Sequence, residues 1–69
     1  MLNRYTWALI FNHVDGEYEE VEHTTLEGAI EHFNMFDDSD SDMYSEIQLI
    51  ERDWKVDRDA CIMIKTFGK

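Results

Sequence analysis

The chain opens with a segment in which apolar and small side chains alternate, as in a β-strand. From Tyr5 to His13, aromatic and β-branched residues occupy much of both alternating sets. These residue types favour pleated structure, and a strand that is apolar on both faces is typical of a sheet centre. We therefore expect a central strand here.

A hairpin should follow this strand. Asp15-Gly16 is a strong turn signal, because glycine tolerates the positive φ angle that short hairpins need. The returning strand is expected over residues 17–23. Its register stays open at this point: a two-residue loop would pair Ile10 with Val21, and a three-residue loop with a bulge would pair Phe11 with Val21.

A helix is expected over residues 24–36. Thr24 can cap the first free N–H groups, and Glu27 can reach back to it. The Asp-rich run 37–42 should end the helix by charge repulsion. Apolar residues recur at helical spacing through the segment: Leu26, Ala29, Ile30, Phe33 and Phe36.

The second half of the chain allows two interpretations. Residues 45–51 read as a strand, although a helical stripe also fits the apolar positions. We favour the strand, because a further strand over Ala60–Phe67 supplies a pairing partner. The competing stripe consists of Met43, Ile47, Ile50 and Trp54.

The element order is then β-β-α-β-β, which predicts a small α+β domain with an antiparallel sheet and one helix packed on one face. We take residues 1–69 as a single acidic domain, because this length leaves room for one small core and none for a separate cofactor domain. One helix cannot cover every apolar strand position. One sheet face should therefore stay partly exposed and open to a dimer or partner contact.

Charge changes this picture. The formal net charge is −10, and residues 5–51 contain 13 acidic side chains and no Lys or Arg. Direct binding to nucleic acid or to an anionic membrane needs a basic surface, so both are disfavoured. Duplex DNA carries roughly one charge per 1.7 Å of axis, so thirteen charges equal the load of about 22 Å of duplex. A field of one sign repels itself, which suggests that it has a use.

In size, acidity and aromatic content the chain resembles the small acidic bacteriophage proteins that act as DNA mimics. The resemblance is compositional and includes no shared motif. It implies a non-enzymatic, phage-encoded inhibitor without a cofactor, located in the host cytoplasm. Its partner would be a basic nucleic-acid-binding protein: a nucleoid-associated protein, or a restriction or repair enzyme. The expected contact residues are Glu17, Glu19, Glu20, Glu22, Glu27, Glu31, Asp37, Asp38, Asp40 and Asp42.

A second hypothesis is an intracellular interaction or assembly module that binds through an exposed apolar sheet face or an edge strand. Such binding would depend little on salt and would be sensitive to Trp7, Phe11 or Trp54. The single cysteine, Cys61, lies in an apolar run and is expected to be buried. We do not expect the beginning of the chain to be a signal peptide or a membrane span, because its apolar run is short.

Metal-binding motifs are weak. Residues 38–42 match the first ligand positions of a calcium loop, but Met43 and Leu49 stand where Gly and Glu are required. His13, His23 and His32 lack metal-ligand spacing, although His23 could meet Glu27 at the helix start. We expect the histidines to be partly exposed, in a negative field that favours the charged imidazolium.

Overall fold

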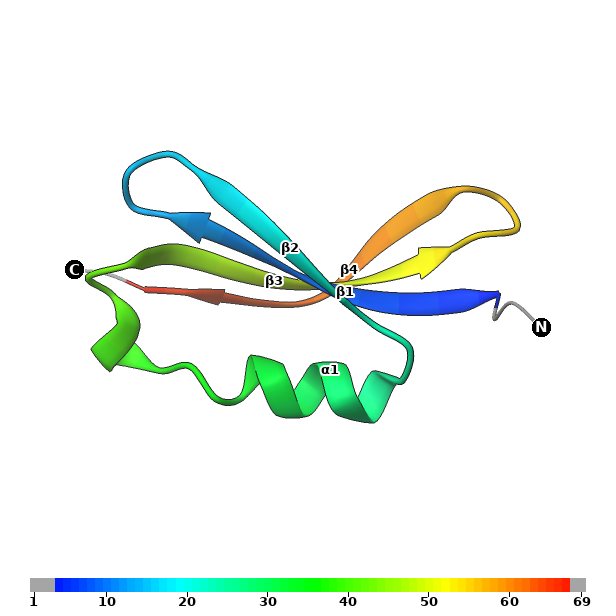
Figure 1. The fold of residues 1–69 in the computed structure, drawn as a ribbon, viewed down its shortest axis with the longest axis horizontal. Helices are drawn as coiled ribbons and strands as arrows, with labels where there is room; N and C mark the ends of the chain where they lie inside the picture. Colours follow the sequence, from blue (N-terminus) through cyan, green and yellow to red (C-terminus); the bar gives the residue numbers. More distant parts are fainter. Residues whose placement is uncertain (1–3, 68–69) are drawn as a thin grey trace.

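The computed structural model describes residues 4–67 and confirms the α+β class. Four antiparallel strands form one sheet in the order β2-β1-β3-β4, and one helix packs on one face of it (Figure 1). The elements are β1 (Tyr5–His13), β2 (Tyr18–His23), α1 (Leu26–Phe33), a short 3₁₀ helix (Asp38–Asp40), β3 (Tyr44–Asp53) and β4 (Arg58–Thr66).

The two central strands are β1 and β3, so the central position expected for the first strand is confirmed. Residues 44–53 form a strand and not a helix, because β1 and β4 pair with β3 along both of its edges. The alternation of β3 sends Ile47 and Leu49 to the face beneath α1 and Ile50 to the other face. We call these the helix face and the open face of the sheet.

The register of the first hairpin differs from both alternatives that the sequence suggested, because Val21 pairs with Leu9. The loop is one residue earlier than expected: the His13 N–H donates to the Glu17 carbonyl, and the Gly16 N–H donates to the His13 carbonyl. Gly16 has a φ of 96°, so the left-handed residue closes a three-residue loop instead of sitting inside a two-residue one. This register keeps Val21 on the helix face.

The helix is shorter than the expected span of residues 24–36. Thr25, and not Thr24, is the N-cap, and its Oγ1 accepts from the Gly28 N–H at 3.1 Å. Glu27 therefore does not complete a capping box. A Cβ on residue 28 would lie 2.9 Å from Thr25 Oγ1, which explains a glycine near the start of the helix.

The C-terminal end of α1 is held from β4. Lys65 donates through Nζ to the carbonyls of Phe33 (3.0 Å) and Phe36 (2.6 Å), and its ammonium lies 4.6 Å from the centroid of the Phe33 ring. A cation at this end satisfies free carbonyls and complements the helix dipole. The helix ends at Phe33, although the apolar periodicity continues to Phe36.

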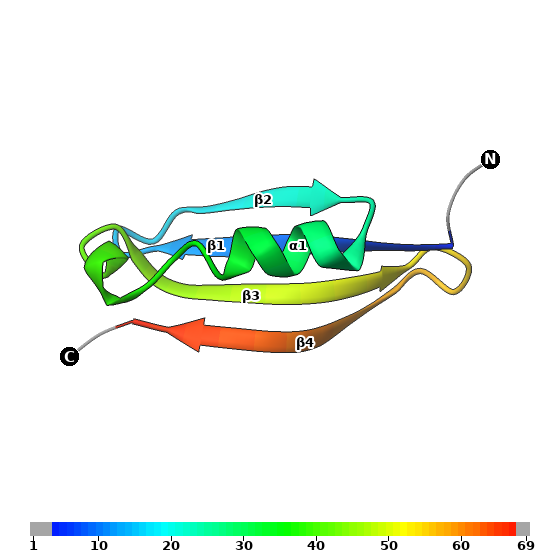
Figure 2. The same cartoon turned by 90° about the horizontal axis from the view of Figure 1, so that it is seen from below.

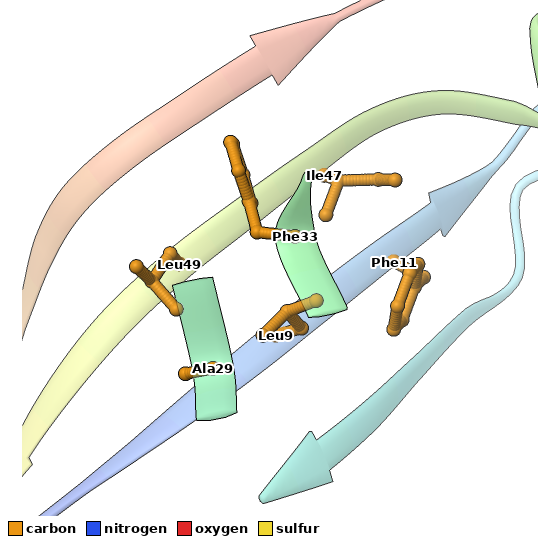
Figure 3. Close-up of a cluster of buried hydrophobic side chains, with 6 residues drawn as sticks. All are labelled: Leu9, Phe11, Ala29, Phe33, Ile47 and Leu49. Atoms are coloured by element: carbon orange, nitrogen blue, oxygen red, sulfur yellow. The ribbon is translucent and has the colours of Figure 1, made fainter. Parts of the chain in front are cut away.

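The core lies between α1 and the two central strands (Figure 3). Ala29 and Phe33 of the helix meet apolar side chains that come from β1 and β3. Leu26, which the periodicity placed in the core, is 36% exposed. The fully or nearly fully buried cluster is Leu9, Phe11, Ala29, Phe33, Ile47 and Leu49.

The helix covers only part of the sheet. Seen from its own side, α1 lies over β1, flanked by β2 and β3, while β4 lies beyond β3 (Figure 2). The β1–β2 hairpin and the 3₁₀ helix lie at one end of the long axis, and the β3–β4 hairpin lies at the other. The Asp-rich run lies at the first of these ends, and Lys55 and Arg58 lie at the second.

The turn between β3 and β4 contains a left-handed non-glycine residue, Asp57, with a φ of 56°. This conformation costs an L-residue about 1 kcal/mol, and glycine avoids that cost. Asp57→Gly should therefore raise the free energy of unfolding by about 0.5–1 kcal/mol in urea denaturation. Asp57→Asn removes the same charge and should give a smaller gain. A loss of stability in Asp57→Gly would contradict the argument.

Candidate functional site: an acidic helix side

The ten acidic residues expected to contact a partner fall into two groups. Glu20 and Glu22 lie on the open face, because they pair with Ile10 and Ala8. The other eight lie on the helix side or at its ends, and we call them the helix-side acids. They are Glu17, Glu19, Glu27, Glu31, Asp37, Asp38, Asp40 and Asp42.

Arg52 pairs with three acids of the open face. This β3 residue donates through Nη1 to Glu20 Oε2 at 2.8 Å and to Glu22 Oε2 at 3.4 Å, both on β2. Its Nε donates to Asp59 Oδ1 on β4 at 2.9 Å. One guanidinium thus joins three strands, and its hydrogen bonds to Asp59 and then Glu20 raise the pKa of Arg52 above its ordinary value.

The polar layer on the open face extends beyond Arg52. Trp54 Nε1 donates to Thr6 Oγ1 at 2.8 Å, and Thr6 Oγ1 donates to Glu22 Oε2 at 2.9 Å. Ala8 and Ile50 lie on the same face and are buried, although α1 packs on the opposite side. Long polar side chains therefore take the place of a second helix on this face.

The helix-side acids are arranged differently. Within residues 4–67, none of the eight forms an ion pair with Lys or Arg. Glu27 and Glu31 are exposed one turn apart on the side of α1 that faces away from Ala29 and Phe33. Glu19, on the β2 edge, meets His13 Nε2 at 3.1 Å.

The Asp-rich run is an ordered turn. Asp37 accepts from the Ser39 N–H at 2.9 Å, and Asp40 accepts from the Asp37 N–H at 2.9 Å, which forms a reciprocal capping box. Hydrogen bonds from the Ser39 hydroxyl and then its backbone N–H lower the pKa of Asp37. The run therefore positions its carboxylates through its own backbone. Among residues 4–67, no group of three His, Cys, Asp or Glu side chains could hold a metal ion.

Most cations lie away from the helix-side acids; the exception is Lys65, which is bound to the Phe36 carbonyl and whose charge contributes to lowering the pKa of Asp37. Arg4 binds Asp53 at 3.0 Å, and this pair lowers the pKa of Asp53. Lys55 and Arg58 belong to the β3–β4 hairpin, at the opposite end from the 3₁₀ helix (Figure 2). Arg4, Lys55 and Arg58 therefore lie toward the end opposite the 3₁₀ helix, and Arg52 pairs only with acids of the open face.

Two histidines join β2 to α1. His23 Nε2 lies 2.9 Å from His32 Nδ1, and His32 packs against Phe11 and Phe36. The sequence suggested that His23 meets Glu27, but in the structure His23 meets His32. Burial, and then the charge of His23, lower the pKa of His32. The expectation that the negative field would favour a charged imidazolium is wrong for this histidine, because it is partly removed from water.

Several other residues differ from the sequence interpretation. Cys61 is exposed and not buried, because it pairs with Ile50 on the open face of an edge strand. Phe11 is buried and Trp7 packs on the core, whereas Trp54 is exposed in the β3–β4 turn. Arg52 is the organising residue that sequence reasoning missed. The only available signal was its spacing from Ile50, which places both on one strand face.

Residues 4–67 form no detectable pocket. In the same part of the chain, no α-helix has the length and apolarity to cross a membrane. Comparisons of the chain with protein-family models, curated proteins and solved structures found no match.

The histidine pair predicts a pH dependence of stability. Because the folded pKa of His32 lies below the ordinary value of 6.5, only the unfolded chain takes up this proton readily near that pH. The free energy of unfolding should therefore be fully retained above pH 6.5 and fall as the pH drops through the folded pKa. Urea denaturation between pH 7.5 and 5.5 should show this loss. His32→Leu should reduce it and His13→Gln should not. Equal loss in all three proteins would contradict the assignment.

The Arg52 network predicts a stability that depends on salt. Arg52→Met should lower the free energy of unfolding by about 1 kcal/mol at low salt, because Glu20, Glu22 and Asp59 would then repel one another unopposed. The difference from the parent protein should shrink in 1 M NaCl, where the Debye length is about 3 Å. Thermal unfolding at both salt concentrations measures it. Lys55→Met removes an exposed cation outside the network and should have little effect.

Proposed function

We propose that this protein is a non-enzymatic acidic inhibitor, encoded by a bacteriophage, that mimics the charge of DNA. It would occupy the basic DNA-binding surface of another protein. The observation that carries the proposal is the set of eight helix-side acids, none of which pairs with Lys or Arg among the residues that the structure describes. These acids remain available to an external cationic partner.

The density of charge supports this proposal. Duplex DNA carries roughly one charge per 1.7 Å of axis, so eight carboxylates match about 14 Å of duplex, or about four base pairs. Neighbouring positions on one helix face, such as Glu27 and Glu31, have Cβ atoms about 5–6 Å apart. Because α1 is packed on the sheet and Asp37 caps its own turn, the charges sit on ordered backbone.

The placement of the cations supports the helix side as the docking surface. Arg52 lies on the open face, and the Lys65 ammonium is bound to the carbonyls of Phe33 and Phe36 and forms no ion pair with the helix-side acids among residues 4–67. A basic surface that approaches from the helix side would meet carboxylates without first meeting a neutralising arginine. Complementary fields of this kind raise association rates and make binding sensitive to salt.

Two variants with equal net charge test the proposal. The helix-side variant carries Glu27→Gln, Glu31→Gln, Asp38→Asn and Asp42→Asn. The control variant carries Asp15→Asn, Glu46→Gln, Glu51→Gln and Asp57→Asn. The probe is the heparin-binding protein fraction of a nuclease-treated bacterial lysate, passed over each immobilised protein. The parent and control proteins should retain basic proteins that elute with moderate salt or with added duplex DNA, whereas the helix-side variant should retain them at least about tenfold more weakly.

Circular dichroism should show that all three proteins are folded, because the substituted side chains lie on the surface or retain hydrogen-bonding groups. Equal retention by the two variants would mean that net charge alone attracts the probe proteins. That result would remove the helix side as a recognition surface. Retention that resists both salt and duplex DNA would contradict DNA mimicry altogether.

A further inference from the structure

The two edges of the sheet are built differently. The β2 edge carries Glu19, Glu20 and Glu22 within six residues, and charged side chains of this kind prevent pairing with another strand. The β4 edge contains five consecutive apolar residues, 60–64, and only Met63 among them is partly buried. A long, apolar, exposed edge strand offers unpaired backbone N–H and C=O groups to another chain.

The apolar surface continues from β4 onto the helix. His32 faces β2 through its contact with His23, so the opposite flank of α1 faces β3 and β4. That flank carries Leu26, which is 36% exposed, and Ile30, which is half-buried. The helix lies over β1 and does not extend over β4 (Figure 2), so the apolar side chains of this flank and of β4 are only partly covered.

We propose that β4 pairs antiparallel with β4 of a second copy of this chain, giving a two-fold symmetric dimer with a continuous eight-stranded sheet. Charge favours this occupant. The strand itself carries Arg58, Asp59 and Lys65, so two copies of a −10 chain would meet along their least acidic edge. Self-pairing through the β2 edge would instead bring Glu19, Glu20 and Glu22 of both copies together.

The bulge in β4 selects the register of the pairing. Ile62 is the extra residue between the pairs Leu49–Met63 and Ile50–Cys61, so the side-chain alternation shifts at that point. Regular self-pairing is therefore confined to the stretch 62–66, centred on Ile64. This register places Ile64 opposite its own copy and Ile62 opposite Thr66, so exposed isoleucines of both copies meet on the open face.

A two-fold axis perpendicular to the sheet relates antiparallel strands that pair edge to edge, so α1 of both copies would lie on the same face. The dimer would then present sixteen helix-side acids on one side. The proposal does not rest on DNA mimicry, because only the β4 edge and the helix flank carry it.

The mass of the protein in solution tests the dimer. Sedimentation equilibrium from about 1 µM to 1 mM should show a reversible transition from one to two copies. Ile64→Lys should weaken association about tenfold or more, because it replaces apolar contact with two facing charges. Tyr18→Lys adds the same charge to an exposed site on the β2 edge and should leave association unchanged.

A cysteine placed at the proposed axis tests the register without a buried charge. The Cys61→Ser, Ile64→Cys protein should form a covalent dimer under mild oxidation, since directly opposed residues lie about 4.5–5.5 Å apart. Cys61→Ser, Val14→Cys places an equally exposed thiol in the β1–β2 loop and should crosslink at least about tenfold more slowly. A monomer at 1 mM would overturn the proposal. So would dimerisation that Ile64→Lys does not weaken, or equal crosslinking at both positions.

Discussion

One short helix has to cover a four-stranded sheet, and most features of this molecule follow from that mismatch. The eight residues of α1 span about 12 Å, whereas the ten residues of β3 extend over about 33 Å. The helix therefore buries only the middle of β1 and β3. The remaining apolar strand positions need other cover, which long polar side chains supply on the open face and the stem of Lys65 supplies near the helix end. Among the apolar residues of β4 that the structure describes, only Met63 is partly buried.

Much of the fold could be predicted from local patterns, because alternation and helical periodicity reflect burial directly. The four strands, the helix and the central position of β1 all follow from such patterns. The hairpin register could not be predicted, because Asp15-Gly16 fits either the middle of a two-residue loop or the end of a three-residue loop. The end of α1 was missed for a different reason. The carbonyl of its last residue is bound by Lys65, a contact that is distant in sequence and that local periodicity does not report.

The candidate site shows the same limit. The acidic residues could be listed from the sequence, but their division between two faces could not, since it depends on the register of β2 on β1 and on which face of the sheet α1 covers. Arg52 reaches Glu20 across β1, a contact between residues 32 positions apart. Cys61 illustrates a related ambiguity, because an apolar run reads alike in a buried strand and in an exposed edge strand.

The order of the strands also has a kinetic consequence. Both hairpins, β1–β2 and β3–β4, are local, but the central pair joins Leu9 to Leu49. Neither hairpin has a core to pack on until that long loop closes, because the core is built from β1, α1 and β3 (Figure 3). The chain loses the entropy of closing this loop before the helix gains its contacts. Folding should therefore be slow and cooperative for a chain of this size. Folding rates of Leu9→Ala and Leu49→Ala proteins would report whether this pair forms in the transition state.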